Sequence, residues 1–165
     1  MITLILTVGL PGSGKSTFLK NRIAKEGGIR ISRDDIRFSM LKDGEDYFAH
    51  ETEVFNTFIK TIQTAIDTGA EEKIYVDATH LSKAGRTKLL DNLDLYNVDK
   101  IEILYFDIPL LTCLRRNEQR RGIGRTYVPK GVIRRMSVQM EAPKLKENYT
   151  YNKIWIVNEG GEING

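Results

Sequence analysis

Residues 9–16 read Gly-Leu-Pro-Gly-Ser-Gly-Lys-Ser and lie between an apolar run, residues 4–8, and a helix-forming stretch, residues 17–20. The eight residues match G-x-x-x-x-G-K-[ST], the phosphate-binding loop, and their flanks predict the strand and the helix that this motif needs. Glycine leaves the backbone free to curl and to aim its amides at anionic oxygens. Lys15 can then reach the β- and γ-phosphates of a nucleoside triphosphate, and Ser16 can offer its hydroxyl to Mg²⁺. The predicted nucleotide-binding residues in this part of the chain are Gly9, Pro11, Gly12, Ser13, Gly14, Lys15, Ser16 and Thr17.

Apolar runs and helical periodicity alternate along the rest of the chain. They predict strands at about 3–8, 29–32, 74–77, 101–106 and 154–157, and helices at about 15–25, 34–41, 48–68, 82–93, 109–119 and 130–140. Such alternation indicates an α/β fold with a doubly wound parallel sheet of four to five strands and ligands beyond their carboxyl ends. Residues 1–158 are predicted to form a single domain, and residues 159–165 a flexible tail.

The bulk composition favours a cytoplasmic protein. The single cysteine, Cys113, lies among leucines in a predicted helix, so it is expected to be a core residue rather than a nucleophile or a metal ligand. This usage suits a reducing compartment. The apolar start of the chain is too short to span a membrane and has no basic leader, so no membrane association is expected.

Positive charge is concentrated in one segment. The net charge is only +3, but residues 115–135 hold eight arginines and lysines against one acid, Glu118. Such a run is often a solvated helix face. In a chain with a phosphate-binding loop, the excess charge also fits the binding of a triphosphate and of a polyanion. Residues 120–129, rich in glycine and arginine, are expected to form a mobile lid.

A second polar cluster follows the second predicted strand. Ser32 and Asp35 form an [ST]-x-x-[DE] capping box, which by itself explains an acid here without catalysis. Asp34 is left to project, and Arg37 lies one helical turn further on the same side. A carboxylate to accept an alcohol proton and a guanidinium to hold a phosphate are what a kinase needs at its acceptor site. The spacing alone fits both the capping and the catalytic interpretation.

Five motifs along the chain occur in an order typical of one kinase family. They are I-L-T-V-G-L-P-G-S-G-K-S-T at 5–17, I-S-R-D-D-I-R at 31–37, V-D-A-T-H-L at 76–81, F-D-I-P at 106–109 and a basic segment at 114–136. In this order they resemble the kinase domain of the polynucleotide 5′-hydroxyl kinases of T-even bacteriophages, within the P-loop kinases. The resemblance covers residues 1 to about 140. It implies an adenylate-kinase-like P-loop fold, a three-layer α/β/α sandwich with an arginine-rich lid.

Position within these motifs implies a role for each polar residue of the site. Lys15 and Ser16 would bind ATP and Mg²⁺, and Asp77, a Walker-B-type acid at the end of a strand, would act on Mg²⁺ through water. A turn-forming role remains the alternative for Asp77. Asp34 would be the general base on the 5′-hydroxyl, and Arg37 would contact a phosphate of the acceptor strand. The implied catalytic residues are Asp34, Lys15 and Arg121.

The lid departs from the phage pattern because it is longer. The resemblance implies that Arg116, Arg121 and Arg125 contact the donor phosphates, and the extra residues before Val128 leave both Arg121 and Arg125 open as the catalytic arginine. The phage enzymes also carry a C-terminal phosphatase domain, which this chain has no room for. Any 3′-phosphatase or ligase activity is therefore expected from other proteins. The resemblance places a phage-encoded chain in the host cytoplasm, and the sequence leaves a homo-oligomer open.

The predicted reaction is transfer of the γ-phosphate of ATP to a 5′-hydroxyl end of DNA or RNA, in nucleic acid repair. The nearest alternative is a kinase for a small alcohol such as a nucleoside or an antibiotic, against which Arg37 and the basic lid favour a phosphorylated acceptor. A nucleotide-binding regulatory module is a second alternative, disfavoured by the acceptor-site carboxylate and by the lack of an N-K-x-D motif. A nucleic-acid-binding subunit is disfavoured by the acidic stretch at 43–46 and by the net charge of −4 outside residues 115–135. His50 and His80 lack metal-ligand spacing and are expected to be bystanders.

Overall fold

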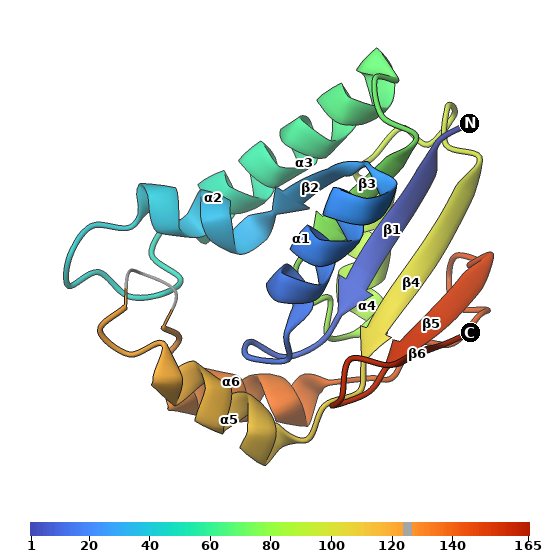
Figure 1. Cartoon of the computed structure of the whole chain (residues 1–165). Helices are drawn as coiled ribbons and strands as arrows, with labels where there is room; N and C mark the ends of the chain where they lie inside the picture. Colours follow the sequence, from blue (N-terminus) through green and yellow to red (C-terminus); the bar gives the residue numbers. More distant parts are fainter. Residues whose placement is uncertain (124–126) are drawn as a thin grey trace.

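The structure is a computed structural model that describes residues 1–123 and 127–165. Its strands are β1 (Thr3–Val8), β2 (Ile29–Ser32), β3 (Lys73–Asp77), β4 (Lys100–Phe106), β5 (Lys153–Val157) and β6 (Ile163–Asn164). Its helices are α1 (Lys15–Glu26), α2 (Arg33–Met40), α3 (Glu51–Thr68), α4 (Lys83–Asp91), α5 (Leu110–Gln119) and α6 (Lys130–Gln139). None of the helices in the described residues is long and apolar enough to cross a membrane. The predicted alternation of strands and helices is confirmed (Figure 1).

The strands form one sheet in the order β2-β3-β1-β4-β5-β6, with β1 and β4 at the centre. Neighbouring strands from β2 to β5 run parallel, whereas β6 pairs antiparallel with β5. The prediction of four to five strands missed β6, and the predicted tail instead turns back to pair Ile163 with Val157. A polar turn makes this possible, because Asn158 Oδ1 accepts hydrogen bonds from the amides of Gly160 and Glu162, both at 3.0 Å. A strand of two residues is too short to show any periodicity.

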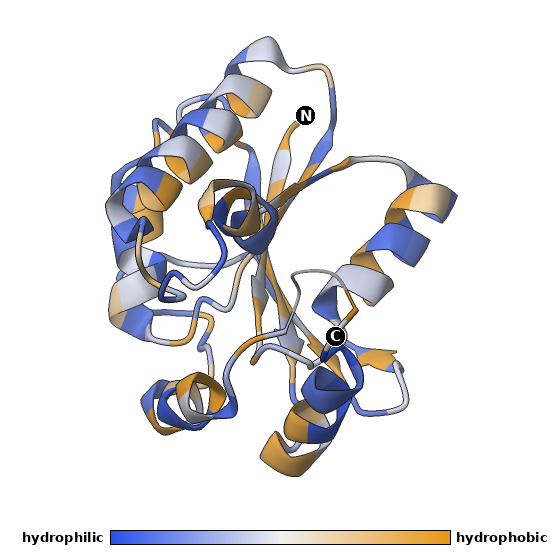
Figure 2. Ribbon diagram, turned by 90° about the vertical axis from the view of Figure 1, so that its left-hand side faces the viewer, coloured by the Kyte–Doolittle hydropathy of each residue, from blue (hydrophilic) through white to orange (hydrophobic). Residues whose placement is uncertain are grey.

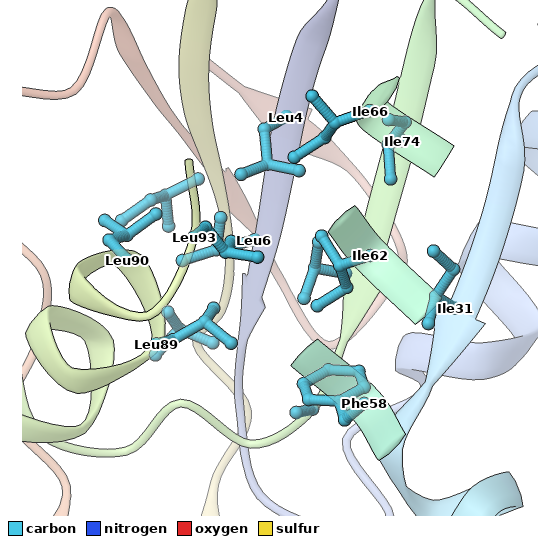
Figure 3. Packing of buried hydrophobic residues seen from close by; sticks show 14 of the residues in the cluster. Leu4, Leu6, Ile31, Phe58, Ile62, Ile66, Ile74, Leu89, Leu90 and Leu93 are labelled. Carbon is cyan, nitrogen blue, oxygen red and sulfur yellow. The ribbon is translucent and has the colours of Figure 1, made fainter. Parts of the chain in front are cut away.

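Helices cover both faces of the sheet and give the expected three-layer α/β/α sandwich. Successive side chains of a strand point to opposite faces. Leu6 of β1 lies in one core cluster with Ile62 of α3 and Leu90 of α4 (Figure 3), whereas Ile5 lies in the other with Leu19 of α1. The helices carry both hydrophobic and hydrophilic residues around their circumference, while the strands between them are largely hydrophobic (Figure 2). Cys113 is fully buried in the second cluster, so its prediction as a core residue is confirmed.

Local capping signals place the helices that carry the site. The Oγ of Ser32 accepts the amide of Asp35 at 3.1 Å, so α2 begins directly at the carboxyl end of β2, and Ser82 caps α4 in the same way. Helix α3 begins at Glu51 rather than at the predicted Phe48, because residues 47–50 form a turn that buries Tyr47. Helices α5 and α6 lie next to each other beyond the carboxyl end of β4 (Figure 1).

Candidate active site

Three cavities follow one another along the carboxyl edge of the sheet. The loop cavity, about 60 Å³, lies over the phosphate-binding loop, between Lys15 and Asp77. The α6 cavity, about 240 Å³, lies between α2, the start of α3 and α6. The hairpin cavity, about 680 Å³, lies between α1, α5 and the turn that joins β5 to β6. Asp34 lines both the loop cavity and the α6 cavity, and Arg120 lines both the loop cavity and the hairpin cavity. The phosphate-binding loop is therefore the middle of a continuous row.

The phosphate-binding loop has the tight conformation that its glycines predict. Gly12 and Gly14 have φ angles of +84° and +93°, in the left-handed region that favours glycine. A Cβ atom on Gly12 would also lie 2.4 Å from the carbonyl oxygen of Cys113, so the loop packs directly against the backbone of α5. Gly14 is the N-cap of α1, and the positive end of that helix faces the loop cavity.

Lys15 is folded back onto its own loop. Its Nζ donates hydrogen bonds to the carbonyl oxygens of Gly9 at 2.9 Å and Leu10 at 2.8 Å. Burial lowers the pKa of this ammonium group, and the carboxylates of Asp77 and Asp34 oppose that shift. A phosphate in the loop cavity offers the same ammonium group a charge-assisted bond, which is stronger than a bond to a neutral carbonyl.

The structure brings together the two residues predicted to act on a metal. The hydroxyl of Ser16 donates to Asp77 Oδ2 at 3.2 Å. A hydroxyl and a carboxylate are the oxygen donors that Mg²⁺ uses together with water and phosphate oxygens, so this donor set fits the metal. Sequence reasoning missed Arg30, whose guanidinium contacts both side chains, with Nε 2.8 Å from Asp77 Oδ2 and Nη2 2.9 Å from Ser16 Oγ. No motif includes Arg30, so only the folded arrangement identifies it.

Asp34 is held in place by a hydrogen-bonded network. Its Oδ1 accepts hydrogen bonds from the hydroxyl of Tyr47 at 2.8 Å and from Nη1 of Arg37. Burial raises the pKa of the Tyr47 hydroxyl well above its usual value, so this group remains a proton donor at neutral pH. The Asp34 side chain is still 40% exposed. The result is a fixed carboxylate that borders two cavities.

Arg37 has a different environment from the one that the sequence predicts. Its side chain is only 7% exposed, Nη1 also donates to the Tyr47 hydroxyl at 2.9 Å, and Nη2 bonds both carboxylate oxygens of Glu51 at 2.9 and 3.0 Å. Arg37 therefore lines the α6 cavity, but both of its terminal nitrogens bind protein groups rather than facing an acceptor phosphate. Its direct effect is to position Asp34. Tyr47 and Glu51 were missed because no local spacing links them to Asp34.

The α6 cavity has charged and apolar walls. Arg33 and Arg135 bring positive charge to it, and Phe48 and Met136 are among its apolar residues. Arg33 is paired with Glu51 at 2.6 Å, whereas Arg135 is exposed. The lining residues that α6 contributes are 132, 135, 136 and 139, which share one face of a helix. That spacing was the signal in the sequence that could have identified Arg135.

The predicted lid arginines are separated by the structure. Arg116 lines the hairpin cavity, whereas the side chain of Arg121 is 64% exposed, pairs with Glu118 at 3.0 Å and lines none of the three cavities. Arg120, which sequence reasoning did not select, lines two of them. Arg120 is the C-cap of α5 and Arg121 lies in the turn beyond it, and in this structure only Arg120 faces the loop. The prediction for Arg125 lies outside the described residues.

The hairpin cavity was also missed by sequence reasoning, because its outer wall is the segment expected to fray. The turn after β5 is fastened to α5 by two hydrogen bonds, from the Thr112 hydroxyl to Glu159 Oε1 at 2.6 Å and from Arg116 Nη2 to the Glu159 carbonyl at 3.3 Å. Thr17, predicted to bind nucleotide, lines the inner wall. A cavity of this volume is in the range of small-molecule sites.

Comparisons with known proteins identify the family and the fold of this chain. The sequence model of a family described as AAA domain matches residues 4–143. A chain in the structure of the Pnkp1/Rnl/Hen1 RNA repair complex is similar, with a TM-score of 0.68 and 25% sequence identity over 84% of this chain and 43% of that chain. This chain therefore spans less than half the length of that relative.

Two kinase structures are similar over most of both chains. A putative kinase from Chloroflexus aurantiacus has a TM-score of 0.73 at 13% identity, covering 99% of this chain and 92% of that one. A sugar kinase from Janibacter sp. has a TM-score of 0.66 at 16% identity, covering 97% and 87%. At such identities the likeness concerns the fold alone, which is a P-loop kinase fold with a mostly parallel sheet. Because the family match extends over residues 4–143, the chain belongs to the AAA domain family.

Proposed function

We propose that this protein is a polynucleotide 5′-hydroxyl kinase that transfers the γ-phosphate of ATP to the 5′-hydroxyl end of DNA or RNA. The observation that carries the proposal is the position of Asp34 at the border between the loop cavity and the α6 cavity. A general base for phosphoryl transfer has to reach the acceptor hydroxyl while the donor phosphates lie beside it. A regulatory module that only binds nucleotide has no use for a carboxylate in this place.

The composition of the α6 cavity supports a nucleotide as the acceptor. A strand end brings an anionic phosphate and a flat apolar base, and the cavity offers Arg33 and Arg135 for the first and Phe48 and Met136 for the second. The similarity to a chain of an RNA repair complex, at 25% identity, supports the same class of acceptor. The excess of positive charge in residues 115–135 is also compatible with a polyanionic acceptor.

The two carboxylate oxygens of Asp34 have different roles in the proposed reaction. Oδ1 is held by Tyr47 and Arg37, and we assign Oδ2 as the atom that takes the proton from the acceptor hydroxyl. As the proton moves to Oδ2, the acceptor oxygen forms a bond to the γ-phosphorus, and the bond from that phosphorus to the bridging oxygen breaks, so that ADP leaves with the bridging oxygen. Glu51 fixes the position of Arg37, and Arg37 in turn fixes the carboxylate of Asp34. The Asp34 carboxylate is therefore already ordered before the acceptor binds.

The donor side provides positive charge for the phosphates. Lys15 exchanges the Gly9 and Leu10 carbonyls for phosphate oxygens, and Arg120 approaches from the end of α5. The Ser16 hydroxyl, and Asp77 through water, would hold Mg²⁺, which would supply positive charge to the phosphate oxygens. The hairpin cavity, next to Arg120, is the space we assign to the nucleoside of ATP.

An acceptor panel tests the proposal. The protein is incubated with Mg²⁺, γ-labelled ATP and, in parallel, a 5′-hydroxyl DNA strand, the RNA strand of the same sequence, a nucleoside 3′-monophosphate, a free nucleoside and gluconate. The matched control is each strand already carrying a 5′-phosphate. We expect label in the 5′-hydroxyl strands and in the 3′-monophosphate, and none in the 5′-phosphorylated strands. Label confined to the nucleoside or gluconate, or label in no acceptor, contradicts the proposal.

A further inference from the structure

The guanidinium of Arg30 lies between the two side chains that fit a metal. Arg30 is on β2, and its side chain is 14% exposed. Its three nitrogens each bind an oxygen: Nε binds Asp77 Oδ2 at 2.8 Å, Nη2 binds Ser16 Oγ at 2.9 Å, and Nη1 binds Asp35 Oδ2 at 3.0 Å. All four residues line the loop cavity, whose volume is only about 60 Å³.

A guanidinium and a hydrated magnesium ion cannot occupy the same place between Ser16 and Asp77. Mg²⁺ needs its oxygen ligands at about 2.0–2.1 Å in octahedral geometry and keeps several waters around it. The nitrogens of Arg30 bind the same Ser16 Oγ and Asp77 Oδ2 that the metal would use, the first directly and the second through water. Entry of the hydrated ion therefore requires the guanidinium to leave Ser16 Oγ and to give up its place beside Asp77 to a water of the metal.

The buried negative charge of Asp77 explains why the Arg30 guanidinium is held beside it. Its side chain is 5% exposed, and a buried carboxylate without a partner is costly. Arg30 supplies both the opposite charge and a directed bond to Oδ2. The same contact keeps Asp77 and Ser16 close enough for their own hydrogen bond of 3.2 Å.

We propose that Arg30 is a positioning residue that substitutes for the metal: it holds Ser16 and Asp77 as an ordered pair before Mg²⁺ is bound and competes with Mg²⁺ for that pair. The inference rests on the Mg²⁺-nucleotide half of the proposed function and is independent of the acceptor. Its consequence is that wild-type protein binds ATP with a weaker dependence on Mg²⁺ than the loop alone would give.

Calorimetry of ATP binding in EDTA and in excess Mg²⁺ tests this competition. The ratio of the two dissociation constants is expected to be about tenfold larger in Arg30→Gln than in wild type, because one charge-assisted contact no longer opposes the metal. Arg22→Gln is the matched control, since it removes the same charge from an exposed pair with Glu26 on α1 and lines none of the three cavities. Arg30→Lys, which keeps the charge but offers a single nitrogen, is expected to give a smaller increase.

Thermal melting of the same variants gives a second readout. Arg30→Gln is expected to melt below wild type in EDTA, because Asp77 loses its partner, and to gain more from Mg²⁺ with ATP than wild type does. A binding ratio in Arg30→Gln and Arg30→Lys equal to or below that of wild type overturns the inference. Wild-type protein that binds ATP but phosphorylates none of the acceptors overturns the proposed function and leaves the inference standing. Wild-type protein that binds no ATP overturns both.

Discussion

Two adjacent acids in α2 give a sharp test of the catalytic assignment. We expect Asp34→Asn to lower the rate of phosphoryl transfer by about 10²- to 10⁴-fold, the usual contribution of a positioned general base, or roughly 3–5 kcal/mol in the barrier. The fold should tolerate the change. An asparagine Oδ1 can still accept hydrogen bonds from Tyr47 and Arg37. Because the Asp34 side chain is 40% exposed, removal of its charge should lower the free energy of unfolding by about 1 kcal/mol or less.

Asp35→Asn is the matched control for that change. Its side chain is 67% exposed, and its described ion pair is with Arg30 at 3.0 Å. We expect a stability cost of about 0.2–1 kcal/mol, from that pair and from the N-terminus of α2, and a transfer rate close to that of wild type when Mg²⁺ is saturating.

Single-turnover transfer to a 5′-hydroxyl strand, ATP calorimetry and urea unfolding separate these effects. Asp34→Asn should bind ATP as wild type does, because the substitution removes no group that we assign to the donor phosphates. The assignment of the base is wrong if Asp35→Asn loses as much transfer as Asp34→Asn does. It is also wrong if Asp34→Asn keeps more than about one tenth of the wild-type rate, since that loss is too small for a missing general base.

Three further predictions address the lid, the loop and a buried histidine. Arg120→Ala should lower single-turnover transfer at least about 100-fold, whereas Arg121→Ala should change it less than about threefold, and equal losses would refute the assignment of Arg120. Gly12→Ala should abolish ATP binding measured by calorimetry, because its Cβ would lie 2.4 Å from the Cys113 carbonyl oxygen at a φ of +84°; retained binding would contradict this packing. Burial lowers the pKa of His80 to about 3, so the unfolded chain takes up a proton below about pH 6.5 that the folded chain does not, and the free energy of unfolding should fall by about 2 kcal/mol from pH 7 to pH 5. Asparagine tolerates the φ of +44° at position 80, so His80→Asn is the variant to compare. Its free energy of unfolding in urea should lack this part of the pH dependence, and an unchanged pH dependence would refute the assignment to His80.

The elements that sequence alone predicted are those with their own local signals. The phosphate-binding loop has fixed glycines, α4 has Ser82 as its cap, and α3 has a long apolar stripe, so each could be placed to within about three residues. Ser16 was predicted from the phosphate-binding motif, and Asp77 from its place at the end of an apolar strand in a motif of the resembled family. The two meet because β1 and β3 are neighbours in the sheet.

The residues that sequence reasoning missed depend on contacts between distant segments. Tyr47 reaches Asp34 and Glu51 reaches Arg37 only because α3 and the turn before it dock beside α2. Arg30 reaches Ser16 only because β2 lies at the edge of the sheet beside β3. Arg120 rather than Arg121 faces the loop because of where α5 ends. None of these geometries leaves a pattern in the local sequence.

The α6 cavity and the hairpin cavity share no lining residue among those that the structure describes. One is built from α2, α3 and α6, and the other from α1, α5 and the terminal hairpin. If the α6 cavity takes the alcohol and the hairpin cavity the nucleoside, as we propose, selection of the two substrates is modular in this fold and the two can be redesigned independently. Exchanging the side chains of α6 that face its cavity, such as Arg135 and Met136, offers a route to a different acceptor while ATP use is preserved.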